Sequence, residues 1–318
     1  MAEVPEFLNL RILITGAGGF IGRACVAGFA AAGWQVRAVS RQPAPARSSV
    51  ERVLSRDPGR ADWTALLHGV DCVLHLAGVA HRPAASLAEY EDINVRLTGA
   101  MARAAVASGV GHFVYLSSVA VHGRDSGDID ETMPLCPGDA NGRSKALAEA
   151  ALREIARDTP MHWTVVRPPL VYGSDAPGKW RRLAVLVRRG IPLPLAAATA
   201  PRSYIGIDNL VSALLCIVDN PKAAEKTYLV SDNDDLCTAD LIRAMAQGVG
   251  RQARLWWLPA RLLSLGASLL GRSGDAERIF GRLQIDTRAI RQELGWAPPI
   301  PAREGIVRAM ADSADGLN

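Results

Sequence analysis

Short aliphatic runs alternate with segments of helical periodicity over the first half of the chain. Residues 10–15 are almost all apolar, and after a cluster of glycines the apolar positions recur at helical spacing from Phe20 onward. Continuous apolar runs of roughly four to eight residues are typical of strands buried in a parallel sheet. Further strands of this kind are predicted over residues 34–40, 50–55, 71–76, 112–117 and 161–167.

Helices are predicted between these strands. The patterns at residues 63–68, 86–108 and 140–158 have helical spacing, whereas residues 119–139 are rich in Gly, Asp and Pro and are predicted as a loop. Pro168 and Pro169 end the sixth strand, because proline lacks a backbone donor and restricts its neighbour. The repeated order of strand, helix and strand predicts an α/β fold with a doubly wound parallel sheet.

Beyond Pro169 this regular alternation stops. The remaining pattern predicts a basic helix over residues 178–189, an alanine-rich loop, a short strand over 202–207, a helix over 208–219 capped by Asp208, and a strand over 227–230 that returns to the sheet. Residues 238–318 are predicted to be mostly helical and to form a smaller cap over the carboxyl edge of the sheet.

The apolar run at residues 255–270 includes Trp256 and Trp257. Because it lacks the cationic polar face of an interfacial helix, we expect it to pack under the cap rather than to touch a membrane. No apolar stretch reaches the length of a membrane span. The N-terminus has no basic region followed by an apolar run, so the expected location is the cytoplasm.

Charge and cysteine content exclude several classes. The net charge of the 318-residue chain is only +4, and no basic block suggests a nucleic-acid partner. The five cysteines are odd in number, widely spaced and without a CxxC pair, which predicts reduced thiols and no zinc or disulfide framework. No metal site is predicted.

The stretch LRILITGAGGFIG at residues 10–22 carries the strongest local signal. A strand ends at Thr15, glycines follow at positions 16, 18, 19 and 22, and a helix begins. In such a turn Gly16 permits the sharp bend, Gly18 and Gly19 let backbone N–H groups approach a pyrophosphate, and Gly22 lets the helix pack on the strand. The sequence therefore predicts a dinucleotide bound at the start of this helix.

The end of the second predicted strand normally selects between the two nicotinamide dinucleotides. A carboxylate there binds a ribose 2′-hydroxyl and repels a 2′-phosphate. This chain has Ser40 and Arg41 instead, with Arg47 further on and no acidic residue until Glu51. The pattern favours NADP over NAD, although Arg41 as a solvated loop arginine is the alternative. Asp57, after the third strand, is expected to border the adenine.

Several separated motifs together resemble the extended short-chain dehydrogenase/reductase family, of the NAD-dependent epimerase/dehydratase type. They are TGAGGFIG, HLAG, LSSVAVHG, NGRSK, RPPLVYG and RSYIGIDN, followed by a closing ELGWAPP. The likeness extends from Leu10 to about Trp296 and is greatest to UDP-glucose 4-epimerase-like proteins and 4-ketoreductases of O-antigen gene clusters. It implies a Rossmann-type sheet domain, residues 1–170 plus 206–235, and a substrate-binding domain, residues 171–205 plus 236–318.

The resemblance also implies roles for individual residues. Gly16, Gly19, Phe20, Ile21 and Gly22 would hold the pyrophosphate, and Leu76, Ala77 and Gly78 would line the cofactor. Pro168 and Val171 would flank the nicotinamide. Asn94 would support the cofactor, although a mid-helix asparagine is more often simply solvated. Ser118 would bind the reacting C4 oxygen, Lys145 the nicotinamide ribose, and Arg202 the diphosphate of a nucleotide-sugar substrate. A homodimer is also implied.

Two positions depart from the family pattern. His122 replaces a tyrosine outside the proton-transfer step, whereas Asn141 stands where the catalytic tyrosine is expected. Reduction of a C4 ketone leaves an oxyanion that needs a proton, and an asparagine side chain does not ionise in the useful range. Asn141 can still donate a hydrogen bond to the carbonyl. On a helix it shares a face with Lys145.

Two functions follow from this sequence. The first is an NADP- or NAD-dependent nucleotide-sugar 4-ketoreductase or 4-epimerase, impaired in proton transfer at Asn141. The alternative is a catalytically silent sensor that binds dinucleotide and reports its state to a partner. Ser118, Lys145 and Arg202 favour the enzyme, because a sensor has little use for an arginine that binds a substrate diphosphate.

Overall fold

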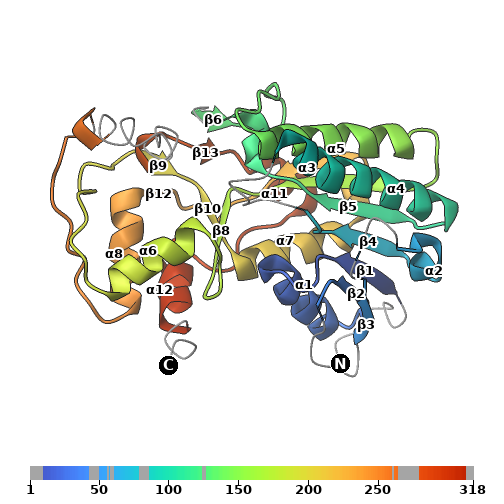
Figure 1. The fold of residues 1–318 in the computed structure, drawn as a ribbon, viewed down its shortest axis with the longest axis horizontal. Helices are drawn as coiled ribbons and strands as arrows, with labels where there is room; N and C mark the ends of the chain where they lie inside the picture. Colours follow the sequence, from blue (N-terminus) through green and yellow to red (C-terminus); the bar gives the residue numbers. More distant parts are fainter. Residues whose placement is uncertain are drawn as a thin grey trace.

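The computed structural model of the protein describes residues 10–42, 50–55, 57, 61–78, 86–123, 127–259, 261–263 and 279–312. Within these residues the chain forms a sheet layered between helices, with a second group of helices beside it (Figure 1). Arg47 and residues 264–270 of the apolar run lie outside the described residues.

A seven-stranded sheet in the order β11-β7-β5-β4-β1-β2-β3 forms the centre of the molecule, and all its strand pairs are parallel. Its strands are β1 (Arg11–Thr15), β2 (Gln35–Ser40), β3 (Val50–Leu54), β4 (Cys72–His75), β5 (His112–Leu116), β7 (His162–Arg167) and β11 (Lys226–Leu229). The strand order reverses between β1 and β4, where open α/β sheets bind ligands. The doubly wound fold predicted from the sequence is confirmed.

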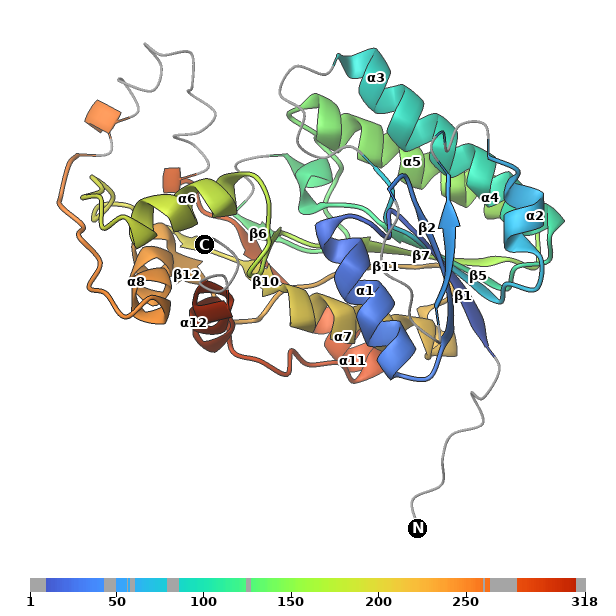
Figure 2. The ribbon, with the colours of Figure 1, turned by 60° about the horizontal axis from the view of Figure 1, so that its bottom comes forward.

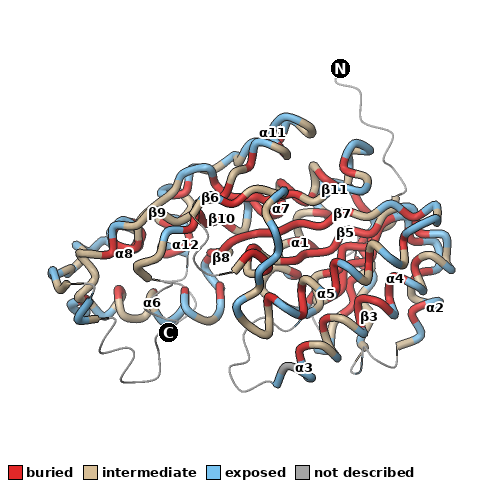
Figure 3. Tube along the Cα trace, turned by 90° about the horizontal axis from the view of Figure 1, so that it is seen from above, coloured by how far each residue is buried: buried red, intermediate tan, exposed pale blue. Residues whose placement is uncertain are grey.

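Helices cover both faces of this sheet (Figure 1). On one face lie α1 (Phe20–Ala31), α7 (Ile207–Val218) and α11 (Arg288–Leu294). On the other lie α2 (Trp63–Leu67), α4 (Leu97–Ala107) and α5 (Ala140–Ala156). Figure 3 shows the buried residues concentrated along the sheet strands between these layers. The strands read as unbroken apolar runs because both of their faces are covered.

A group of helices beside the sheet, which we call the helical lobe, has its own apolar core. It contains α6 (Lys179–Arg188), α8 (Thr238–Gly248) and α12 (Ala302–Asp312), and Figure 2 shows it at one end of the sheet. The remaining short elements are β6 (Asp128–Ile129), β8 (Leu170–Tyr172), β9 (Pro201–Arg202), β10 (Tyr204–Gly206), β12 (Leu236–Cys237), β13 (Gln284–Ile285) and the 3₁₀ turn η4 (Pro221–Ala223).

Several predicted boundaries were wrong. The helix expected over residues 86–108 is α3 (Leu87–Glu91), a π turn η2 (Asp92–Arg96) and then α4. Asp208 does not cap α7, because the helix already begins at Ile207 with Gly206 at the N-cap. The strand expected over 202–207 is divided between β9 and β10, which pair with different partners. The loop expected over 119–139 contains a 3₁₀ turn, η3 (Val119–His122), and β6.

The expectation that the tryptophans of the apolar run pack under the cap was also wrong. Trp256 is 48% exposed and Trp257 is 68% exposed, although Leu255 between Arg254 and Trp256 packs against the core of the helical lobe. Alternating directions along an extended segment account for Trp256 beside Leu255, whereas Trp257 lies beyond the bridge between Leu193 and Leu255 and is exposed as well. Among the described residues, no helix is long and apolar enough to cross a bilayer.

Candidate active site

The glycine turn between β1 and α1 is too tight for side chains. Gly16 has φ +65°, and a Cβ there would lie 2.9 Å from the backbone nitrogen of Ala77. A Cβ on Gly22 would lie 2.1 Å from the carbonyl oxygen of Gly16. The turn therefore requires glycine at both positions, because α1 starts against the backbone of the preceding turn.

Helix α1 begins at this turn in a form suited to an anion. Its N-cap, Gly19, supplies no side-chain hydrogen bond, and the first turn contains no acidic residue. Phe20 and Ile21 at the helix start are partly buried, in the cores of the helical lobe and the sheet respectively. The first N–H groups of α1 thus remain available to a phosphate, so the local structure fits a dinucleotide pyrophosphate.

Ser40 and Arg41 at the end of β2 lie beside the same turn. A Cβ on Gly18 would contact the Ser40 side chain at 3.4 Å, and Ser40 Oγ donates a hydrogen bond to the Gln42 carbonyl oxygen at 2.6 Å. Arg41 is exposed, and Asp57, also exposed, follows β3. A cation at the end of β2, without a carboxylate beside it on that strand, suits a 2′-phosphate better than a bare ribose.

A buried histidine connects the ends of β1 and β4. Thr15 Oγ1 accepts hydrogen bonds from the backbone nitrogens of Leu76 and Ala77, both at 3.1 Å, and therefore donates to His75 Nδ1 at 2.8 Å. His75 Nε2 donates to Thr98 Oγ1 at 3.0 Å. Burial lowers the pKa of His75 to about 3. His75 is neutral and holds the Leu76–Gly78 segment in position.

Asn94 continues this chain of hydrogen bonds toward α5. Thr98 Oγ1 donates to the Asn94 carbonyl oxygen at 2.6 Å, and Asn94 Nδ2 donates to Ser144 Oγ at 2.8 Å. Ser144 Oγ donates in turn to the backbone oxygen of Asn141 at 2.9 Å. Asn94 lies in the π turn and is only 1% exposed, so the interpretation as a solvated mid-helix residue was wrong. π turns within helices are frequent at functional sites.

Lys145 lies where β4, β5 and α5 meet. Its Nζ donates to the Leu116 carbonyl oxygen at 2.7 Å and lies 4.7 Å from the centre of the Tyr115 ring. A Cβ on Gly78 would lie 3.4 Å from this Nζ and 3.0 Å from Asn94 Oδ1. Burial lowers the pKa of Lys145 to about 8, and the Glu149 carboxylate partly opposes this shift. Gly78, Asn94 and Lys145 thus form one cluster at the carboxyl edge of the sheet.

The start of α5 carries Asn141 one turn before Lys145. Asp139 caps the helix by accepting from the Gly142 nitrogen at 2.8 Å. A Cβ on Gly142 would lie 2.4 Å from the Ala120 carbonyl oxygen, so the helix start packs directly against η3. Asn141 Oδ1 is buried and has no hydrogen-bond partner within the described protein. A buried acceptor of this kind is costly unless a ligand supplies the donor.

Ser118 immediately precedes η3, so the Gly142 contact brings it near Asn141. Its Oγ accepts from the Ala120 nitrogen at 3.2 Å, which leaves the hydroxyl hydrogen to donate elsewhere.

His122, at the end of η3, already has its Nε2 lone pair occupied. Its Nε2 accepts from Arg167 at 3.0 Å, and burial and the Arg167 charge lower the pKa of His122. His122 is therefore neutral and unsuited to replace a tyrosine as proton donor.

Glu149 and Arg167 form a charged layer beneath Lys145. They make an ion pair at 2.6 Å with the side chains 0% and 4% exposed, and Ser117 Oγ donates to the same carboxylate at 2.5 Å. This layer was missed at the level of sequence. The i, i+4 spacing of Asn141, Lys145 and Glu149 places all three on one face of α5 and is the signal that could have found it.

Pro168 and Val171 lie after β7, on the path from the sheet to the helical lobe. The Pro168 carbonyl oxygen accepts from the Val119 nitrogen at 3.0 Å, and Val171 in β8 pairs with Ile205 in β10. Pro168 therefore borders η3, whereas Val171 packs against the apolar core of the sheet.

The profile of the NAD dependent epimerase/dehydratase family matches residues 12–231. The chain belongs to this family. The family is described as NAD dependent, so the predicted cofactor, NAD or NADP, is confirmed at the level of the family. The glycine turn and the cluster at Lys145 have a structure that fits such a nicotinamide dinucleotide.

Two relatives in this epimerase/dehydratase family cover nearly the whole chain. A UDP-glucose 4-epimerase of Vibrio cholerae is 31% identical over an alignment of 321 positions that covers 93% of each protein. An N-acetyl-alpha-D-glucosaminyl-diphospho-ditrans,octacis-undecaprenol 4-epimerase of Escherichia coli O157:H7 is 27% identical over 95% of each.

Solved structures share the fold of this family member. MoeE5, determined in complex with UDP-glucuronic acid and NAD, superposes with a TM-score of 0.81 at 24% identity over 96% of this chain and 100% of that one. A UDP-glucuronic acid 4-epimerase from Bacillus cereus, determined with NAD, gives a TM-score of 0.80 at 19% identity over 97% of each chain. These structures confirm the fold.

Arg202 lies apart from the cluster at Lys145. It is in β9, pairs with Leu236 of β12, and donates from NH1 to the Gly281 carbonyl oxygen at 2.5 Å. It is partly buried within the helical lobe. Arg202 therefore belongs to the two-stranded sheet of β9 and β12, whereas Asn141 and Lys145 belong to α5.

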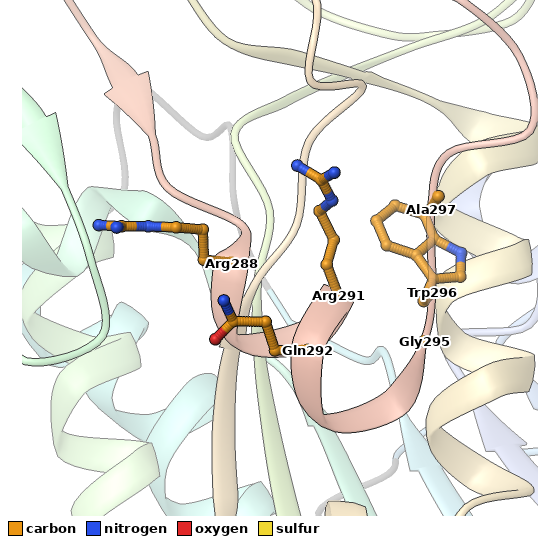
Figure 4. A pocket seen from close by; sticks show the side chains of 6 residues that line it. All are labelled: Arg288, Arg291, Gln292, Gly295, Trp296 and Ala297. Atoms are coloured by element: carbon orange, nitrogen blue, oxygen red, sulfur yellow. The ribbon is translucent and has the colours of Figure 1, made fainter.

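A surface hollow of about 400 Å³ lies elsewhere, along α11 and the turn that follows it. Figure 4 shows its lining side chains. They are Arg288, Arg291, Gln292, Gly295, Trp296 and Ala297. None belongs to the candidate site, and Arg288 already pairs with Asp286 at 2.6 Å. This hollow is not the active site.

Proposed function

We propose that this protein is an NADP- or NAD-dependent nucleotide-sugar oxidoreductase that acts at C4 of a UDP-hexose or UDP-N-acetylhexosamine. Relatives of 31% and 27% identity are named as 4-epimerases of a UDP-sugar and of a diphospho-linked sugar. The observation that carries the proposal is the cluster of Gly78, Asn94 and Lys145 at the sheet's switch point, one helical turn from Asn141.

A bound nicotinamide dinucleotide would supply hydride transfer to or from the sugar. The glycine turn and the start of α1 would hold its pyrophosphate, and Lys145 and Asn94 would position its nicotinamide end. Ser118 would donate a hydrogen bond to the C4 oxygen, and Asn141 would use its buried Oδ1 to accept from a substrate hydroxyl. Arg202 would contact the diphosphate, for which its fork of donors is suited.

The residue at position 141 favours ketone reduction over epimerisation. Epimerisation needs a base to remove the proton of the C4 hydroxyl and an acid to return it, whereas reduction of a ketone needs only the acid. Lys145, with a pKa of about 8, is mostly protonated at neutral pH. It can supply a proton there but accepts one poorly. We therefore propose 4-ketoreduction as the faster reaction of this sequence.

The test is single-turnover oxidation of NADPH by a UDP-4-keto-hexose, followed by the absorbance of the reduced nicotinamide across pH. If Lys145 is the acid, the rate falls as pH rises through about 8, since the protonated form is then lost. In a parallel arm, UDP-glucose and UDP-N-acetylglucosamine are incubated with NAD and analysed for their 4-epimers. Epimerisation at a rate equal to or above ketone reduction would contradict the proposal.

Binding assays separate the enzyme from the sensor. Arg202→Ala is expected to weaken UDP-sugar binding and to leave dinucleotide binding nearly unchanged, measured by calorimetry. If no sugar nucleotide binds or reacts while the dinucleotide still binds, the protein is the silent sensor rather than an enzyme.

A further inference from the structure

Two segments of the helical lobe carry basic residues without any acidic ones. Residues 176–207 contain six Lys or Arg residues, and the described residues between 241 and 263 contain four, while neither segment contains Asp or Glu. The whole chain, in contrast, has 36 basic and 32 acidic residues. The basic character belongs to these two segments, because α8 and α12 of the same lobe also carry Asp240, Glu304 and Asp312, and Arg243 pairs with Asp240 at 2.7 Å. The small net charge of the protein conceals it.

The fold brings the two segments together at one surface. Leu193 and Leu255 form a parallel bridge, in which the Leu193 nitrogen donates to the Arg254 oxygen at 2.8 Å and the Trp256 nitrogen donates to the Leu193 oxygen at 3.0 Å. Arg254 NH1 also donates to the Gly190 oxygen at 3.4 Å. The end of α6 and residues 251–257 thus lie side by side, at the outer end of the helical lobe (Figures 1 and 2).

The same surface exposes large apolar side chains. Leu255 packs into the lobe, so Arg254 and Trp256, its neighbours in an extended segment, point away from the core. Trp256, Trp257 and Ile191 are 48%, 68% and 39% exposed. We call the set of exposed residues here the basic–aromatic surface. It consists of Arg189, Ile191, Arg251, Arg254, Trp256 and Trp257.

We propose that the basic–aromatic surface docks the protein onto an anionic lipid bilayer. Indole rings are amphipathic and favour the boundary between headgroups and acyl chains. The arginines around them complement lipid phosphates, and no carboxylate of either segment opposes that attraction. Position supports the same occupant, because an outer end of the molecule can meet a flat bilayer while the sheet stays clear of it. The proposal does not depend on the proposed catalytic activity.

The test is co-sedimentation of the full chain with vesicles of phosphatidylcholine alone or of equal parts phosphatidylcholine and phosphatidylglycerol. Binding is expected only to the anionic vesicles and should weaken as salt is added. Trp256→Ser combined with Trp257→Ser should reduce the partition coefficient about tenfold or more. Arg251→Gln and Arg254→Gln should each reduce it by about fivefold. A blue shift of tryptophan emission on vesicle binding, absent in the double tryptophan variant, would show that these rings enter the interface.

Two matched variants test whether any exposed apolar side chain would support vesicle binding. Leu54→Ser and Leu147→Ser alter side chains that are 47% and 43% exposed outside the helical lobe, so both should bind vesicles like the unmodified protein. Circular dichroism and thermal unfolding check that each variant is folded. Equal vesicle binding by the double tryptophan variant would overturn the proposal. A dimer in sedimentation that the same variant abolishes, without vesicle binding, would assign the surface to a second copy instead, and salt-sensitive binding to nucleic acid alone would also overturn it.

Discussion

The starts of α1 and α5 lie on either side of the same short segment, Ala77 and Gly78, yet they are built in different ways. At α1 the turn is defined by missing side chains, since a Cβ on Gly16 or Gly22 would meet backbone atoms. At α5 the site is defined by polar side chains: a buried lysine, a buried asparagine oxygen and an ion pair beneath them. The shape of a backbone turn suffices to bind a phosphate, whereas proton transfer needs a particular titratable group. A single substitution can therefore abolish proton transfer and leave phosphate binding intact.

The sharpest test of this contrast is Asn141→Tyr. Restoring a hydroxyl acid one turn from Lys145 should raise the single-turnover rate of ketone reduction by about 10² to 10⁴, the usual contribution of a positioned general acid. Asn141→Phe is the matched control, because it adds the same ring without the hydroxyl and should give no gain. If the tyrosine variant is no faster while the unmodified protein reacts briskly, another group donates the proton.

Among the parts of this site, we expect substitutions in the charged layer of Glu149 and Arg167 to lower the free energy of unfolding most. Glu149→Gln leaves Arg167 buried without its partner, and we expect a loss of about 3 to 5 kcal/mol in the free energy of unfolding. Glu154→Gln on the same helix is the control, since its pair with Arg157 has both side chains 65% exposed and should change stability by about 0 to 1 kcal/mol. Urea unfolding measures both, and similar losses would mean that burial is not what matters.

At the glycine turn we expect the opposite effect, in which adding a side chain destabilises the protein and weakens dinucleotide binding. Gly22→Ala should cost about 1 to 3 kcal/mol of stability, because the new methyl group would meet Gly16 and Ala17 backbone atoms. Dinucleotide affinity should fall more than UDP-sugar affinity. Gly127→Ala, where a Cβ meets no atom within 4 Å, should have neither effect. Unchanged dinucleotide binding in Gly22→Ala, measured by calorimetry, would contradict our assignment of the turn.

The smallest expected effect concerns the choice of cofactor. The unmodified protein should bind NADPH more tightly than NADH, and Arg41→Ala should reduce that preference by about tenfold, the effect of one charge-assisted hydrogen bond of roughly 1.5 to 3 kcal/mol. The affinity for NADH should not change, and it serves as the internal control. Equal affinities of the unmodified protein for both dinucleotides would disprove the preference for NADP.

The sequence predicted the sheet well because each strand is buried on both faces and its apolar run is unbroken. It did not predict the π turn at Asn94, because the buried hydrogen bond from the Asn94 side chain goes to Ser144 on another helix, 50 residues away in the sequence. Glu149 and Arg167 were missed for a similar reason, since their partners are distant in sequence. The burial of Trp256 and Trp257 was predicted wrongly because apolar composition alone does not say whether a side chain reaches the core.

The chain of hydrogen bonds from Thr15 to α5 ends on the backbone oxygen of Asn141, not on its side chain. These hydrogen bonds consequently do not depend on which side chain is present at position 141. In evolutionary terms, this position can be exchanged without loss of the scaffold. Asparagine and tyrosine codons differ by one base, so a single mutational step exchanges these two side chains while the hydrogen-bonded backbone stays the same.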